Sequence, residues 1–145
     1  MGKSLKIRIS SPLINFVILA TGLCLPLLLS VLIRVTGYSE IVEELAKGAV
    51  VLFLILKLSE RREQVIWVLI FGLAFGLSEA LLYLNNLLQY GNLVPLYWRL
   101  ALTVPMHIVS VWLIWSLSQY KKILLPLGLI LAILWHYGFN AMLAF

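Results

Sequence analysis

Three glutamates and two histidines, which can exchange protons or bind metals, lie inside long apolar stretches of this sequence. They are Glu43, Glu44, Glu79, His107 and His136. An ionisable group at bilayer depth costs on the order of 2.5 to 3.5 kcal/mol on insertion scales, so such groups generally face a protein interior or a water-filled cavity and serve a function. Carboxylates that activate water, with imidazole or amide donors that stabilise an oxyanion, are the groups that peptide-bond hydrolysis needs.

The composition shows why charge at these positions is unusual. Hydrophobic residues make up 63% of the 145 residues and charged residues 12%, whereas about a quarter of the residues are charged in soluble domains. The mean hydropathy is +1.05. We therefore predict an integral membrane protein. The net charge of +5 comes from short basic clusters between the apolar stretches, which indicates membrane topology and argues against a nucleic-acid partner.

Five apolar stretches are each long enough to cross a hydrocarbon core of about 30 Å, which takes about 20 helical residues. They cover residues 12–33, 40–58, 65–88, 97–118 and 123–145. The connecting segments are too short to hold another domain, so we expect residues 1–145 to form a single all-α, polytopic membrane helical bundle with antiparallel neighbours. The first stretch is expected to be a retained anchor, and the other four are expected to form the active-site bundle.

The basic residues predict the orientation of this bundle. If the chain alternates across the membrane, eight of them fall on one side: Lys3, Lys6, Arg8, Lys57, Arg61, Arg62, Lys121 and Lys122. The opposite side holds Arg34, and Arg99 lies just inside the fourth stretch. The positive-inside rule then places the N-terminus in the cytoplasm and the C-terminus outside.

The polar residues are spaced so that they share helix faces. Residues three or four apart lie on one face of a helix. This groups Glu40, Glu43, Glu44 and Lys47; Gly72, Gly76 and Glu79; Arg99, Thr103, His107 and Ser110; and His136 with Asn140. With a rise of about 1.5 Å per residue, the ionisable groups lie between about 5 and 15 Å below the outer surface. We expect them to converge on one pocket, with the two glycines allowing a neighbouring helix to approach closely.

The adjacent glutamates are the candidates for a general base. Either Glu43 or Glu44 would take a proton from the attacking water. Neighbouring residues on a helix point about 100° apart, so only one of them is expected to face the pocket squarely. Lys47 is spaced to pair with either glutamate, and Arg99 is a supporting residue.

The other three helices would complete the chemistry in one of two ways. Without a metal, Glu79 and His107 help to hold the water, while His136 and Asn140 donate hydrogen bonds to the oxyanion. With a metal, Glu79, His107 and His136 bind zinc together with a carboxylate of the glutamate pair, and water fills an open position. The sequence leaves both mechanisms open, because it contains no HExxH motif.

Two other classes of function use the same residues. A small transporter or a proton-handling or ion-handling membrane protein also places Glu, His and Arg inside a bundle, but at several depths across the membrane. Here the polar groups stop in the outer half, which favours a pocket closed at its inner end. A catalytically silent scaffold held by buried ion pairs is the third alternative.

Four short motifs follow one another on the four polar stretches. They are Glu43-Glu44-x-x-Lys47, Phe75-x-x-x-Glu79, Arg99 followed by His107, and His136-x-x-x-Asn140. In this order they resemble the PrsW family of intramembrane proteases, which is related to the CAAX-protease and bacteriocin-processing (CPBP, or Abi) superfamily. The resemblance covers residues 40–145 and implies a minimal member of the family. Related CAAX proteases carry His where this chain has Glu79, which argues against prenylated substrates.

The resemblance also implies where the protein works and on what. The family carries the label metalloprotease, and its implied activity is regulated cleavage of a membrane-bound signalling protein. The implied location is the plasma membrane of a prokaryote. The expected partners are a membrane protein or peptide substrate and the lipid bilayer, and a homo-oligomer is compatible with the sequence.

Overall fold

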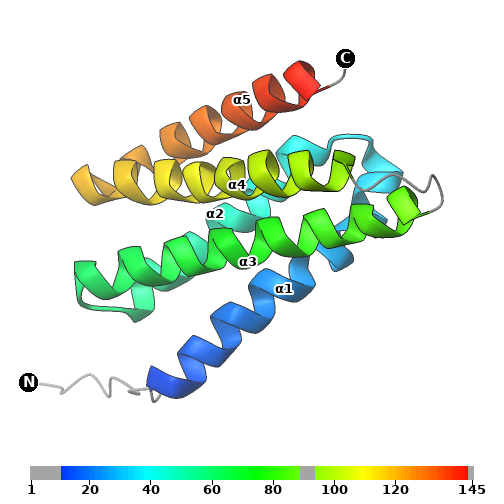
Figure 1. The fold of residues 1–145 in the computed structure, drawn as a ribbon. Coiled ribbons are helices and arrows are strands. Elements are labelled where there is room, and N and C mark those ends of the chain that lie inside the picture. The colour runs from blue at the N-terminus through cyan, green and yellow to red at the C-terminus, as the bar shows by residue number, and fades with distance from the viewer. Residues whose placement is uncertain (1–10, 89–93, 144–145) are drawn as a thin grey trace, which may run out of the picture.

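The computed structural model describes residues 11–88 and 94–143 of the chain, and over these residues it is helical without strands. The helices are α1 (Ser11–Thr36), α2 (Ser39–Lys57), α3 (Arg61–Leu88), α4 (Val94–Tyr120) and α5 (Leu125–Leu143), with a 3-10 turn at Lys122–Leu124 (Figure 1). The predicted all-α bundle is confirmed. Each predicted stretch corresponds to one helix, and the boundaries differ by a few residues.

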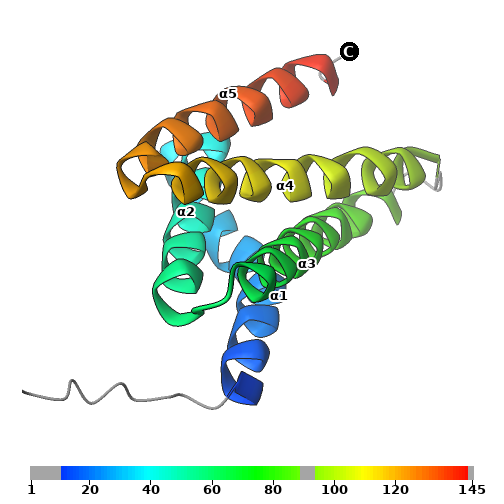
Figure 2. The same ribbon diagram turned by 90° about the vertical axis from the view of Figure 1, so that its left-hand side faces the viewer.

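The helices are arranged so that α2 is central. In both views α4 lies between α3 and α5, and α1 packs against α3 (Figures 1 and 2). The steeply inclined α2 contacts all four of the other helices. The helix with the most charged residues therefore has its polar face covered by the rest of the bundle.

Among the described residues, four helices are long and apolar enough to cross a membrane, which makes this a membrane protein. These segments are Pro12–Thr36, Arg61–Leu82, Leu100–Tyr120 and Leu125–Met142. Helix α2 is not one of them, because its first three turns carry Glu40, Glu43, Glu44 and Lys47. The predicted crossing by residues 40–58 stays a prediction.

The exposure along α2 is nevertheless the reverse of that in a soluble protein. Its buried side chains include Glu43, Glu44 and Lys47, whereas its exposed ones include Leu45 and Leu56. In water a helix hides its apolar face, whereas in lipid the polar groups must find partners inside the protein. The polar face of α2 is therefore turned toward protein and its apolar face outward, as a lipid environment requires.

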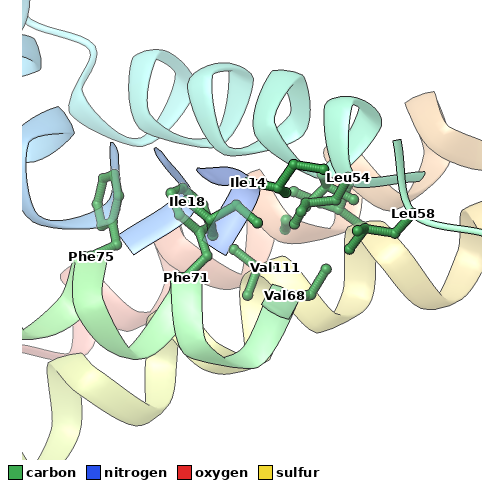
Figure 3. Close-up of a cluster of buried hydrophobic side chains, with 11 residues drawn as sticks. Ile14, Ile18, Leu54, Leu58, Val68, Phe71, Phe75 and Val111 are labelled. Carbon is green, nitrogen blue, oxygen red and sulfur yellow. The ribbon is translucent and has the colours of Figure 1, made fainter. Parts of the chain in front are cut away.

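An apolar layer fills the middle of the bundle. Figure 3 shows side chains of α1, α2, α3 and α4 meeting there, among them Ile18, Leu54, Phe71 and Val111. Ala132 of α5 belongs to the same buried cluster. The predicted site residues are on α2, α3, α4 and α5. On each of these helices they lie beyond the apolar layer, toward one end of the bundle. The layer is thus the floor of the site.

Two glycines of α3 allow α4 to approach closely. A Cβ added at Gly72 would lie 2.6 Å from Val111 Cγ2, and one added at Gly76 would lie 2.9 Å from Val104 Cα. Neither space can hold a methyl group without movement of a neighbour. The predicted close approach beside Glu79 is confirmed, and it brings the α4 backbone at His107 against α3.

Candidate active site

The predicted site residues of four helices meet in one buried cluster. Helix α2 contributes Glu43, Glu44 and Lys47, and α3, α4 and α5 contribute one residue each. Those residues are Glu79, His107 and His136. The convergence that spacing and depth predicted from the sequence is therefore present among the described residues.

Lys47 is the centre of the cluster. Its Nζ donates to Glu44 Oε1 at 2.6 Å and to His107 Nδ1 at 2.7 Å, and it lies 3.8 Å from Glu43 Oε2. The ammonium also lies 4.5 Å from the centre of the Phe75 ring, which provides a cation–π contact. The lysine side chain is 0% exposed. The carboxylates, the imidazole lone pair and the ring face stabilise the charged ammonium and offset the cost of burying it.

The contact with Lys47 determines the protonation of His107. A lysine ammonium has donors and no acceptor, so Nδ1 of the imidazole must accept. The ring proton of neutral His107 is then on Nε2, which faces Glu79 Oε2 and donates to it. Lys47, His107 and Glu79 thus form a relay of hydrogen bonds from α2 through α4 to α3.

His136 is held by Glu44, at the same oxygen that accepts from Lys47. Its Nδ1 lies 2.9 Å from Glu44 Oε1, so Nδ1–H donates to that carboxylate. Glu44 Oε1 therefore accepts from both Lys47 and His136, which makes it a fixed structural anion. In the neutral imidazole the lone pair is on Nε2, so His136 can donate a second hydrogen bond only when it is doubly protonated.

Glu43 differs from Glu44 in how its carboxylate is bound. Glu43 is buried, and its Oε2 has no hydrogen-bond partner among the described residues. Its carboxylate lies within 4.8 Å of ligand atoms of both Glu79 and His107. One oxygen of Glu44 is also unpartnered, but the other accepts two strong donors. Of the two glutamates that the sequence left equivalent, Glu43 has the freer carboxylate.

Asn140 is bound differently from the prediction that it acts beside His136. Its Nδ2 donates to Glu40 Oε1 at 2.8 Å, one turn farther from the apolar layer on both α2 and α5. Glu40 was predicted to share a face of α2 with Glu43, Glu44 and Lys47, but no partner was predicted for it. Donation by Asn140 to an oxyanion stays a prediction. The side chain of Arg99 lies outside the described part of the chain.

Phe75 belongs to one of the four motifs, but no role was predicted for it from the sequence. Its ring lies beneath Lys47 and 4.9 Å from the His107 ring, centre to centre. The available signal was its position one turn before Glu79, which puts both side chains on one face of α3. An aromatic residue on that face is usually part of the apolar core. Only the packing of α2 against α3 shows that this ring also contacts Lys47.

The geometry can be compared with that of known proteins. No protein-family model, no curated protein and no solved structure matches this chain. The resemblance to the PrsW family therefore stays a prediction that rests on the four motifs. The function must be inferred from the cluster itself.

The cluster has more carboxylates than ammonium groups. Glu43, Glu44 and Glu79 face the single ammonium of Lys47, so two negative charges need protons or a cation if all three are ionised. A protonated His136 and one protonated carboxylate would supply the balance from within the described residues. A divalent metal would supply it from outside.

A metal at this position would use Glu43, Glu79 and His107, because their ligand atoms all lie within 4.8 Å of one another. His136, which the sequence analysis included among the zinc ligands, is not in this group and is bonded to Glu44. A histidine binds zinc through a lone pair, whereas Nε2 of His107 carries a proton while Lys47 donates to Nδ1. As arranged, these residues do not fit zinc.

Proposed function

We propose that this chain is an intramembrane endopeptidase that hydrolyses a peptide bond of a membrane-associated protein with water activated by Glu43. The observation that carries the proposal is the unbonded oxygen of a buried Glu43, beside the His107–Glu79 pair. A buried carboxylate oxygen without a partner costs free energy, so its retention favours a use for it. Water is the smallest molecule that would satisfy it.

In this mechanism Glu43 takes a proton from the water while the water oxygen attacks the substrate carbonyl carbon. The carbonyl electron pair moves to its oxygen. When that pair re-forms the carbonyl bond, the carbon–nitrogen bond breaks, and Glu43 gives its proton to the leaving nitrogen. The His107–Glu79 pair fixes the position of the water from the α3 and α4 side. The low-dielectric surroundings strengthen each of these polar contacts.

The oxyanion needs donors on the α5 side of the pocket. His136 can donate from Nε2 as an imidazolium, whose charge Glu44 would compensate through Nδ1. Asn140 retains a second amide hydrogen, since its described bond to Glu40 uses only one. Lys47 supports the whole arrangement as a positioning residue through Glu44 and His107.

A purely structural role explains only part of the cluster. Ion pairing accounts for Lys47 with Glu44, and a hydrogen bond accounts for His136. It accounts less well for Glu43, whose carboxylate lies 3.8 Å from the Lys47 ammonium and whose removal would leave both of those contacts in place. A scaffold would replace such a residue with an apolar side chain at lower free energy.

A transporter would need polar groups that continue through the bundle. Below Lys47 and His107, the described residues form the apolar layer of Val51, Leu54 and Val111, each 0% exposed. This apolar floor interrupts any polar path through the bundle below the cluster, and so it favours hydrolysis over transport. The PrsW resemblance suggests the corresponding substrate, a membrane-bound signalling protein in the plasma membrane of a prokaryote.

The proposal is tested with purified protein in proteoliposomes. The substrates are a panel of single-span reporter proteins that carry different fluorescent domains at their two ends, so that cleavage separates the colours. We expect cleavage by the natural chain and a loss of about a hundredfold to ten-thousandfold in Glu43→Gln. Glu60→Gln, an exposed glutamate before α3, is the matched control and should cleave normally. Equal cleavage by both variants contradicts the proposal.

A further inference from the structure

A second polar site lies at the opposite end of the bundle from Glu43. A pocket of about 470 Å³ lies between the α2–α3 connection and the last turns of α4. Figure 1 shows the end of α2, the start of α3 and the end of α4 on the same side of the molecule. The apolar layer separates this pocket from the candidate active site, so it needs an account of its own.

The walls of this pocket are held rigidly by Gln64, which is 5% exposed. Its amide nitrogen donates to the Leu58 carbonyl at 2.7 Å, and its oxygen accepts from Trp115 Nε1 at 3.2 Å and Gln119 Nε2 at 3.1 Å. One side chain of α3 thereby joins the end of α2 to the end of α4. A pocket built this way is formed before any ligand arrives.

The lining carries positive charge. Arg61 and Lys121 contribute a guanidinium and an ammonium, and none of the described lining residues is acidic. Arg61 Nη2 donates to the Gln119 carbonyl at 3.3 Å, which holds the guanidinium at the rim. A guanidinium has five N–H donors, so this bond leaves others for an anion. Ser59 and Ser118 add hydroxyl groups to the lining.

Apolar side chains flank the two cations. Leu56 and Tyr120 line the pocket and are 63% and 81% exposed. They lie at the ends of α2 and α4, and α4 is one of the four helices apolar enough to cross a membrane, so its end lies where a bilayer changes from hydrocarbon to headgroup. A soluble anion would gain nothing from these surfaces, whereas the first carbons of an acyl chain would bury them. Charge and apolar surface side by side match a phospholipid better than free phosphate.

We infer that this pocket binds the phosphate headgroup of an anionic phospholipid, with Arg61 and Lys121 on the phosphate and Leu56 and Tyr120 against the acyl chains. The predicted orientation places this end of the bundle in the cytoplasmic leaflet. Basic pockets between membrane helices on that side are suited to anionic headgroups. The bound lipid would fix the depth of the bundle independently of any catalysis.

The test counts the lipids that stay bound to the protein. The full chain is reconstituted in vesicles of equal parts phosphatidylglycerol and phosphatidylcholine, extracted into mild detergent and examined by native mass spectrometry. The natural chain should retain phosphatidylglycerol in preference to phosphatidylcholine. In Arg61→Gln/Lys121→Gln, retention should weaken about fivefold for each cation removed. Arg61→Lys/Lys121→Arg keeps both charges and should retain the lipid, which separates lost charge from lost folding.

The control variant is Lys57→Gln/Arg62→Gln. These two residues are exposed and basic, and they lie at the same end of the bundle without lining the pocket. The inference holds if this variant binds like the natural chain. It is overturned if both double glutamine variants lose lipid equally, because a general basic band would then suffice. Displacement of the lipid by inorganic phosphate alone would also overturn it, in favour of a soluble phosphate ligand.

Discussion

Lys47 donates a hydrogen bond to Nδ1 of His107 across 2.7 Å, between two helices and out of reach of solvent. The ammonium cannot accept, so this one contact assigns the imidazole proton to Nε2 and directs it at Glu79. The same lysine neutralises Glu44, to which it donates at 2.6 Å. A residue that the sequence suggested as a helper of the glutamate pair is therefore the residue that orients the whole cluster.

Replacing this lysine should destabilise the protein strongly. In Lys47→Met, Glu44 stays buried without its cation, and a broken buried ion pair costs about 3 to 5 kcal/mol. The measurement is the free energy of unfolding in mixed micelles titrated with sodium dodecyl sulfate and followed by circular dichroism. Lys57→Met, at the exposed end of α2, should leave that free energy nearly unchanged. Equal losses in the two variants would mean that the buried contacts contribute little.

The two adjacent glutamates should separate stability from activity. Glu44→Gln removes the partner charge of Lys47 and is expected to cost about 3 to 5 kcal/mol of unfolding free energy. Glu43→Gln should cost much less stability, because its Oε2 has no hydrogen bond to lose and lies 3.8 Å from Lys47, yet it should abolish reporter cleavage. Unfolding and cleavage are measured on the same preparations. If Glu44→Gln folds normally and does not cleave, the roles of the two residues are reversed.

The convergence of four helices could be predicted because buried charge in lipid must meet a partner inside the protein. The choice between Glu43 and Glu44 could not be predicted. It depends on the rotation of α2 about its axis, which the packing of Val51 and Leu54 in the apolar layer determines. Helical periodicity and depth place both glutamates near the cluster, but they do not determine which glutamate pairs with Lys47.

The partner of Asn140 could not be predicted from the sequence either. Spacing correctly put it on the face of His136, but its bond to Glu40 depends on how far α5 is shifted along α2 and α4. Close contacts of glycines limit that shift: a Cβ at Gly48 would lie 3.0 Å from Leu129, and one at Gly128 would lie 3.0 Å from Ile114. Such contacts between distant segments leave no local periodic signal.

The hydrogen-bond relay predicts how the protein responds to metals. Cleavage should survive chelation by EDTA, and purified protein should hold far less than one zinc per chain, because Nε2 of His107 is protonated. Lys47→Met frees Nδ1 to take that proton, so it should bind cobalt or zinc more tightly than the natural chain does. Elemental analysis and cobalt absorption spectra measure both effects. Stoichiometric zinc that Glu79→Gln removes would instead establish a metal site.

The close approach of α3 and α4 can be tested with two alanine substitutions. A Cβ at Gly76 would lie 2.9 Å from Val104 Cα and 3.2 Å from His107 Cδ2, and the backbone atom cannot yield without moving α4. Gly76→Ala should cost about 1 to 3 kcal/mol of unfolding free energy and should reduce cleavage by displacing His107. Gly138→Ala on α5 meets nothing within 4 Å, so helix propensity alone should make it neutral or stabilising by up to about 1 kcal/mol. Equal cleavage by both variants would mean that His107 can move without loss of activity. That outcome would contradict a relay of direct hydrogen bonds, whose geometry does not tolerate such movement.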